Sequence, residues 1–158
     1  MKRRAVPLLS FALSVSCSSA PKSGMPASVE PTVDAGLAAL GAEYVEKRGC
    51  PQCHQSTNRV DGILSGSTTP LLGTLVYPRN LTPDPETGLG TWSDDDIARA
   101  IRDGFAPGLA PLCIQMSRFD RIGDPEVKAM IAYLRSIPAV RRLIPPSICP
   151  PIKFAHDD

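Results

Sequence analysis

The feature that most constrains this chain is a run of two cysteines and a histidine, Cys50-Pro51-Gln52-Cys53-His54. This C-x-x-C-H spacing is typical of covalent haem attachment, because two residues between the thiols let both sulfurs reach the vinyl positions of one porphyrin. The adjacent histidine can then ligate the iron from one face. We therefore expect one haem c, attached through Cys50 and Cys53, with His54 as an axial ligand.

Two other kinds of site could use the same cysteines. A thioredoxin-like redox motif would begin a helix after a strand, whereas the residues before Cys50 have the pattern of a helix. A structural zinc site could add Cys113 and Cys149 to the pair. Zinc modules usually bring their second ligand pair closely spaced, however, and these two cysteines lie far apart in the sequence. Haem attachment is therefore the favoured interpretation.

Length and charge restrict the class of protein. The chain has 158 residues, enough for one small domain once an N-terminal leader is removed. Its net charge is +1 and 21% of its residues are charged, without a basic stripe beyond the first four residues, so we expect no nucleic-acid partner. The 17 prolines and 12 glycines concentrate in residues 18–31, 65–90 and 138–151, which we interpret as a tether, a long wrapping loop and a tail.

The N-terminus has the pattern of an export signal. A positive segment, Lys2 to Arg4, precedes an apolar segment, residues 5–15, that is too short to span a bilayer as a stable helix. Residues 13–17 resemble a bacterial lipobox, although Ser14 stands where that motif normally has leucine. We expect export to the bacterial periplasm. Lipid attachment at Cys17, which would anchor the chain to a membrane, and simple secretion both remain open.

The remaining cysteines predict a disulfide. The five cysteines of an exported chain leave an odd one unless they have different roles. With two assigned to haem and Cys17 to lipid or to the leader, Cys113 and Cys149 are left to pair. This bond would stabilise the domain by about 3 to 4 kcal/mol through the entropy of the unfolded chain. Two buried free thiols are the alternative, since bond geometry does not follow from sequence.

Hydrophobic spacing predicts three helices, over residues 33–47, 93–104 and 124–137. The apolar residues at helical spacing in the first helix are Leu37, Leu40, Tyr44 and Val45. This face should pack on the last helix. Ser93 should be the N-cap of the second helix, which three aspartates follow, and Asp124 should be the N-cap of the third.

No helix or strand is predicted between His54 and Trp92. A structureless stretch of that length is unusual in a compact domain, but a bound porphyrin would give it an apolar surface to cover. The apolar residues that we expect around this porphyrin are Ile63, Leu64, Leu71, Leu72, Val76, Leu81 and Leu89. The predicted fold class is therefore all-α, with three main helices and long loops wrapped around one covalent haem. We predict a leader over residues 1–17, a tether over 18–32, a haem domain over 33–140 and a tail over 141–158 that the disulfide ties back.

The loop before the second helix carries a longer motif. Residues 77–93 read YPRNLTPDPETGLGTWS. This string resembles the N-[IL]-T-P-D-x-x-T-G-[IL]-G-x-W-[ST] signature of cytochrome c subunits that accept electrons from membrane-bound dehydrogenases. Over residues 34–140 the order of elements is similar to that of a class I monohaem cytochrome c. Some related subunits carry three haem modules, whereas this chain has one C-x-x-C-H run and no internal repeat, so it resembles a single module.

The resemblance implies a methionine as the second axial ligand. Members of the family place it after the second helix, commonly as Ala-Met-Pro followed by an aromatic residue. Met116 occupies that place here, with Ser117 instead of the proline. Elimination points the same way, because Met25 lies in the tether and Met130 lies on an apolar helix face. His156 in the tail and an open sixth position are the alternatives.

Haem also carries two propionates, which need hydrogen-bond donors at the edge of a pocket. The donors that we expect are Arg79, Asn80 and the indole N–H of Trp92. The alternatives are a solvated arginine, a turn asparagine and a core tryptophan.

Together these features predict an electron carrier rather than an enzyme. Ligation by His54 and Met116 and partial burial would set the potential of the iron. The donor would be a dehydrogenase or a quinol-oxidising complex, and the acceptor a cytochrome or a terminal oxidase. The alternative is a haem c protein with an open distal site, acting as a peroxidase-like enzyme or as a gas or redox sensor.

Overall fold

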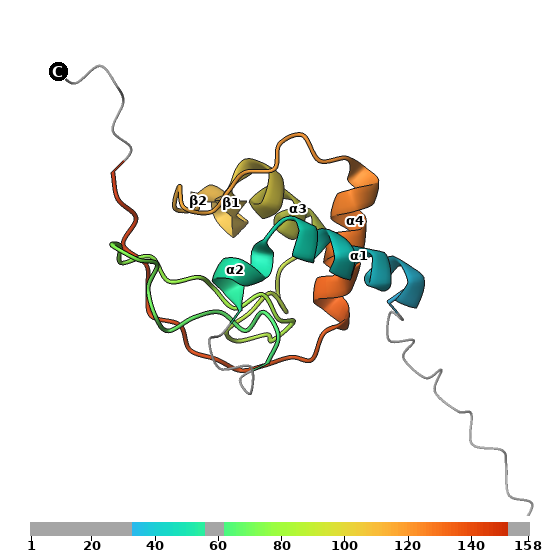
Figure 1. Ribbon diagram of the computed structural model, residues 1–158, viewed down its shortest axis with the longest axis horizontal. Coiled ribbons are helices and arrows are strands. Elements are labelled where there is room, and N and C mark those ends of the chain that lie inside the picture. The colour runs from blue at the N-terminus through green and yellow to red at the C-terminus, as the bar shows by residue number, and fades with distance from the viewer. Residues whose placement is uncertain (1–32, 56–61, 152–158) are drawn as a thin grey trace, which may run out of the picture. The chain divides into compact units, whose positions relative to one another are not determined.

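The computed structural model describes residues 33–55 and 62–151, and helices are its main elements (Figure 1). In those two ranges the helices are α1 (Ala35–Lys47), α2 (Cys50–His54), α3 (Asp94–Asp103) and α4 (Asp124–Ser136). The strands there are β1 (Phe105–Ala106) and β2 (Ala110–Pro111), an antiparallel pair joined by the 3-10 turn η2 (Pro107–Leu109).

A largely helical fold is therefore confirmed. The three predicted helices correspond to α1, α3 and α4, and α2 is the C-x-x-C-H run, for which the sequence pattern predicts no helix of its own. The predicted leader, the tether, Cys17, Met25 and His156 lie outside the described residues.

Small residues on α1 pack against α4. The buried positions of α1 are Ala38, Gly41 and Val45. A Cβ atom on Gly41 would lie 1.9 Å from the carbonyl oxygen of Ala129 in α4, so only glycine allows the two backbones to approach this closely. Packing of the first helix on the last is confirmed, but two of the residues predicted to form the packed face do not belong to it. Leu37 and Leu40 are 37% and 41% exposed, because the small residues, and not the leucines, face α4.

The hydrophobic core joins α1, α3 and α4 to the loops between them. Its buried members are Val45, Leu64, Leu89, Ile97, Ile101, Ile122, Val127, Met130, Ile131, Leu134 and Ile137. Trp92 and Tyr44 are partly buried against this cluster.

The start of α3 follows the predicted capping signals, whereas that of α4 differs. Ser93 Oγ accepts a hydrogen bond from the Asp96 backbone N–H, and the Asp96 carboxylate accepts one from the Ser93 backbone N–H, each at 3.1 Å. The prediction that Asp124 caps α4 is wrong, since Gly123 is the N-cap. Asp124 is the first helical residue, and its carboxylate accepts a hydrogen bond from Arg102 of α3 at 2.6 Å.

Residues 62–93, between α2 and α3, form turns and loops, and the tail runs beside them (Figure 1). Leu75 and Ile148 form an isolated antiparallel bridge. The predicted Cys113–Cys149 disulfide is present, so hydrogen bonds and a covalent bond both hold the tail in place.

Candidate functional site

A cavity of about 710 Å³ brings the predicted site residues together. Its walls come from the ends of α1 and α2, the loop between α2 and α3, the helices α3 and α4, the segment after β2, and the tail. The predicted residues that line it are Cys50, Cys53, His54, Arg79, Asn80, Trp92 and Met116. Its volume is within the range of small-molecule and cofactor sites.

The apolar lining is only in part the predicted one. Leu71, Val76, Leu81 and Leu89 line the cavity. Ile63 and Leu72 do not, since they are 52% and 103% exposed, and Leu64 is buried in the hydrophobic core instead. Sequence analysis missed the lining that comes from the helices, namely Val45, Ile97, Ile101, Met130 and Leu134.

His54 is held through one of its two ring nitrogens. Its Nδ1–H donates to the carbonyl oxygen of Arg79 at 2.8 Å. Burial lowers the pKa of His54 below its ordinary value of 6.5, and this hydrogen bond opposes the shift only in part. The ring is therefore neutral at neutral pH, and Nε2 is the nitrogen left for a metal. Sequence reasoning missed this partner, because every residue type carries the same backbone carbonyl.

The two thiols of the C-x-x-C-H run lie on α2, where the chain turns sharply after α1. Gly49 makes this turn with a φ of 75°, a left-handed conformation that favours glycine. Burial raises the pKa of the Cys50 thiol to about 11. Reactive cysteines of thioredoxin-like motifs have a lowered pKa, so this environment does not favour thiol–disulfide chemistry at Cys50.

The disulfide excludes the zinc site that sequence analysis raised as an alternative. Cys113 and Cys149 are bonded to each other and cannot serve as thiolate ligands together with Cys50 and Cys53. Among the residues that the structure describes, no other group of three or more His, Cys, Asp or Glu side chains could hold a metal ion.

Met116 lies in a turn that begins at this disulfide. Its backbone N–H donates to the carbonyl oxygen of Cys113 at 3.0 Å. Gln115 of the same turn also lines the cavity, and in the described part of the chain its buried Oε1 has no hydrogen-bond partner. Sequence analysis did not identify Gln115 as a site residue, since no motif marks it.

The three predicted propionate donors differ in how many of their N–H groups already form hydrogen bonds within the protein. Arg79 Nη1 donates to the carbonyl oxygens of Ile144 and Pro145, each at 3.1 Å. A guanidinium has five N–H groups, so these two bonds leave others for a carboxylate. Trp92 borders the cavity while packing on the core.

Asn80 has both of its amide hydrogens engaged within the protein. Its Nδ2 donates to Thr87 Oγ1 at 3.1 Å and to the Val140 carbonyl oxygen at 2.7 Å. Its Oδ1 accepts from the Thr82 N–H at 3.0 Å and from the Thr82 hydroxyl at 2.8 Å. A bond from Asn80 to a propionate would therefore require the loss of one of the two donated bonds.

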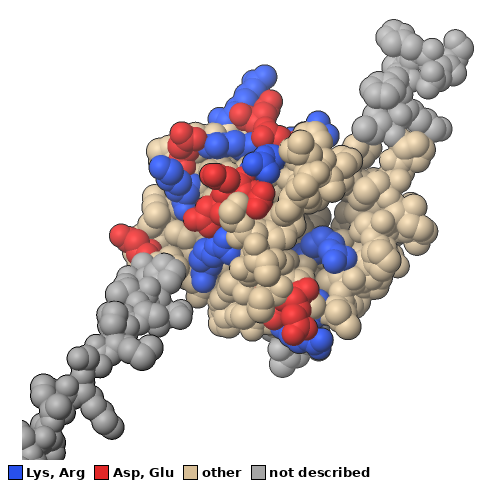
Figure 2. Space-filling model, turned by 180° about the vertical axis from the view of Figure 1, so that it is seen from behind, with Lys and Arg blue, Asp and Glu red and all other residues tan. Residues whose placement is uncertain are grey.

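One face of the molecule shows how its charged side chains are distributed. On the face shown in Figure 2, Lys and Arg side chains lie among Asp and Glu side chains, and neither sign forms a separate patch. Within the described residues, no helix has the length and apolar character needed to cross a bilayer.

The known proteins that resemble this chain match between about half and three quarters of it. No family model matches it. One of the subunits of nicotinate dehydrogenase from Pseudomonas putida is 33% identical over 129 residues, which cover 75% of this chain and 11% of that protein. The gluconate 2-dehydrogenase cytochrome c subunit of Pantoea cypripedii is 35% identical over 96 residues, 58% of this chain and 21% of that protein. A diheme cytochrome c-type protein of Cereibacter sphaeroides is 34% identical over 90 residues, 52% of this chain and 30% of that protein.

This chain thus matches less than a third of the length of each of these relatives. The cytochrome c subunit of an alcohol dehydrogenase and the cytochrome subunit of a fructose dehydrogenase match it as well. The resemblance to the cytochrome c subunits of dehydrogenases is confirmed.

Proposed function

We propose that this chain, which is similar to the cytochrome c subunits of dehydrogenases, is a haem c electron carrier and not an enzyme. His54 and Met116 are the proposed axial ligands, and Cys50 and Cys53 the proposed thioether partners. The observation that carries the proposal is the 2.8 Å hydrogen bond from His54 Nδ1 to Arg79, on the wall of a cavity that Met116 and both cysteines also line. A histidine engaged through Nδ1 leaves Nε2 for a metal, and imidazole with thioether is a known ligand pair of c-type haem.

The residues present fit this group. The cavity combines two thiols, an imidazole and a thioether with walls that are mainly apolar. Haem iron bound among these residues would supply a one-electron couple. The Arg79 carbonyl keeps the proton of a neutral His54 on Nδ1, and leucine, valine and isoleucine side chains keep water away from the ring.

Arg79 and Trp92 are the proposed donors to the propionates. The remaining N–H groups of Arg79 and the indole N–H of Trp92 are compatible with that role, because both side chains line the cavity. For Asn80, the four hydrogen bonds to its own loop and to Val140, which directly precedes the tail, favour a role in holding the loop in place.

The proposed partners are redox proteins. A dehydrogenase or a quinol-oxidising complex would donate the electron, and a cytochrome or an oxidase would accept it. The relatives named as subunits of dehydrogenases support this part of the proposal. The apolar leader-like segment and Cys17 support export to the periplasm, with lipid attachment as one route to the membrane.

A haem c protein with an open distal site is the second candidate. The observation that favours it is Gln115, whose buried Oε1 borders the cavity beside Met116 and has no partner in the described part of the chain. Polar groups near an open iron position influence which ligands bind there. Fast carbon monoxide or cyanide binding to the unmodified protein at neutral pH would favour this candidate over the electron carrier.

Substitution of Met116 tests the electron carrier directly. Met116→Ala should keep the covalent haem, because neither the thioethers nor His54 depend on that side chain. The weak sulfur-to-ferric-iron charge-transfer band should disappear, the reduction potential should fall, and carbon monoxide should bind faster.

Met130→Ala is the matched control. Met130 borders the cavity but is 1% exposed and belongs to the core, and it is not the proposed ligand, so its truncation should cost about 2 to 5 kcal/mol of stability and leave the band intact. An unchanged spectrum in Met116→Ala, with loss of the band in Met130→Ala or in a truncation before His156, would mean that the ligand assignment is wrong.

A further inference from the structure

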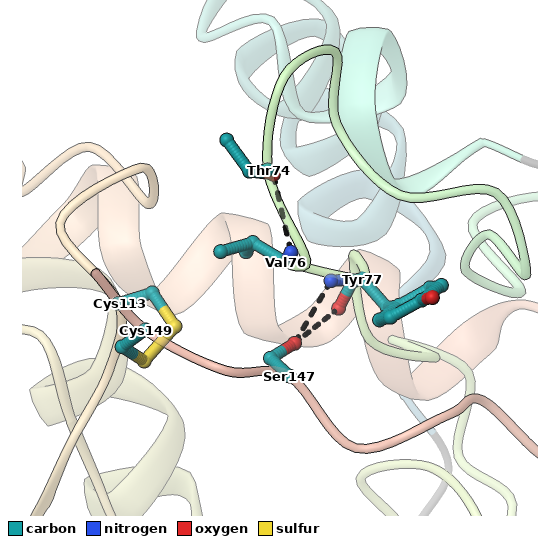
Figure 3. The surroundings of a disulfide bond; sticks show 6 residues. All are labelled: Thr74, Val76, Tyr77, Cys113, Ser147 and Cys149. Atoms are coloured by element: carbon teal, nitrogen blue, oxygen red, sulfur yellow. Dashed lines mark hydrogen bonds between the residues drawn. A yellow bond between two sulfur atoms is a disulfide. The ribbon is translucent and has the colours of Figure 1, made fainter.

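The last described segment of the chain is bound to the loop that precedes the signature motif. We call residues 141–149 the strap. Ser147 Oγ accepts a hydrogen bond from the Tyr77 N–H at 2.8 Å and donates to the Tyr77 carbonyl oxygen at 3.2 Å (Figure 3). The Ile148 N–H donates to the carbonyl oxygen of Leu75 at 2.9 Å. Pro146, Ser147 and Cys149 line the cavity, so the strap forms part of its wall.

The strap is also connected to both proposed axial ligands. At its end, Cys149 is bonded to Cys113, with the two Cα atoms 5.0 Å apart, and the Cys113 carbonyl accepts the Met116 N–H at 3.0 Å. Nearer its start, the strap accepts the two bonds from Arg79 Nη1, and the Arg79 carbonyl accepts the proton of His54. One segment therefore joins the turn of Met116 to the partner of His54.

The turn of Met116 lies between two backbone anchors. The Leu112 N–H donates to Gly104 at 2.8 Å, and the Phe119 N–H donates to Ile101 at 3.0 Å. Between these anchors Ile114, Ser117 and Arg118 are exposed, so packing holds this stretch weakly. The disulfide fixes the turn at Cys113, three residues before the proposed ligand.

We propose that the Cys113–Cys149 disulfide and the strap position Met116 as the sixth ligand. This inference rests on the proposed function, and it assigns to the disulfide a role beyond stability. Breaking the bond frees the turn to move away from the cavity while the thioethers and His54 keep the haem attached. If the disulfide only stabilised the fold, breaking it would lower the denaturation midpoint and leave the iron ligands unchanged under native conditions.

The test is the double variant Cys113→Ala/Cys149→Ala of the full, haem-loaded chain. Both cysteines are replaced, because a single free thiol could itself bind iron. We expect the mass of the protein to show that haem is still covalently attached, and the circular dichroism to show that the helices are retained. The charge-transfer band should weaken or disappear, and carbon monoxide should bind at least about tenfold faster. An unchanged band and an unchanged carbon monoxide rate would overturn the inference.

Val127→Ala is the stability control, because Val127 is 2% exposed in α4 and does not line the cavity. It should lower the denaturation midpoint and leave both readouts unchanged. If it accelerated carbon monoxide binding as much as the double variant, instability alone would explain the effect and the inference would be wrong.

Reduction of the unmodified protein provides a second route if the double variant does not fold. A small dithiol would reduce the disulfide and become oxidised to its own disulfide, transferring two electrons and two protons. Carbon monoxide binding should accelerate once Cys113 and Cys149 have been reduced and alkylated, so that neither thiol can bind the iron, whereas complete labelling without acceleration would contradict the inference. The Met116→Ala variant separates the two proposals. If Met116→Ala leaves the charge-transfer band unchanged, the ligand assignment and this inference both fail. If Met116→Ala removes the band while the cysteine double variant keeps it, only this inference fails.

Discussion

At the scale of single residues, Asn80 lies on the cavity wall, but its amide forms hydrogen bonds to other parts of the protein. It is 1% exposed, and its amide makes hydrogen bonds to Thr82, Thr87 and Val140. Thr87 Oγ1 in turn accepts the backbone N–H of Arg142 at 2.9 Å. The asparagine and threonines of the signature motif therefore bind the loop to Val140 and to the start of the strap.

We predict that Asn80→Ala destabilises the haem-loaded protein. The substitution leaves the buried Thr82 N–H without its acceptor, at a cost of roughly 1 to 3 kcal/mol, and removes one of the two donors to the Val140 carbonyl oxygen. Urea unfolding of the haem-loaded variant and of the unmodified protein measures the loss. Glu86→Gln is the control in the same loop, because the ion pair of Glu86 with Arg141 is more than half exposed and should matter little. If Asn80→Ala instead shifted the reduction potential with stability unchanged, Asn80 would be a propionate donor.

At the scale of elements, the junction of α1 and α4 depends on an ion pair as well as on small residues. Arg48, which caps the end of α1, donates from Nε to Glu126 in the first turn of α4 at 2.6 Å. The Arg48 guanidinium also lies 5.7 Å from the ring centre of Phe119. The hydrogen bond from Arg48 holds the pKa of Glu126 below its ordinary value of 4.5.

The contribution of this pair to stability should therefore depend on pH. Because the pKa of Glu126 is lower in the folded state, the contribution is complete above pH 4.5 and is lost as the pH falls through the folded-state value. Glu126→Gln should lower the urea midpoint at pH 7, and the difference from the unmodified protein should shrink in acid. A difference that stayed constant between pH 7 and pH 2 would show that the ion pair does not contribute.

Particular residues show which parts of the elements follow from sequence. The bounds of α3 were predictable because Ser93, Asp96 and Gly104 act on backbone groups within a few residues of themselves. The buried face of α1 was not, because it depends on how closely the Ala129 backbone of α4 approaches Gly41. The contacts of Asn80 were not predictable for the same reason, since Val140 is 60 residues away in the chain.

At the scale of the whole described domain, the cavity borders the hydrophobic core directly. Residues from α1, α3 and α4 belong both to the core and to the cavity wall, among them Val45, Ile97 and Leu134. Of the site itself, the C-x-x-C-H motif predicted only Cys50, Cys53 and His54, and all three line the cavity. The helical half of the wall and the bond between His54 and Arg79 depend on tertiary packing that no local pattern encodes.

Cys50→Ala/Cys53→Ala should therefore give a poorly folded product. Without covalent attachment the apolar walls of a cavity of about 710 Å³ lose the group that would cover them. Several kcal/mol of lost burial corresponds to a fall in melting temperature of at least about 10 °C. Far-ultraviolet circular dichroism during heating measures it. Native helicity and an unchanged melting temperature in haem-free protein would show that the haem is not part of the core.

The disulfide also makes a closed covalent loop of residues 113–149, with the whole of α4 inside it. The exposed residues Arg118 and Arg121 lie within this loop, just before α4. A protease that cut the backbone there would produce two fragments that remain one molecule until the disulfide is reduced. The helix and the strap would stay attached to the rest of the domain after the cut. Cleavage of this exposed stretch next to the site would therefore not by itself separate the domain into two parts.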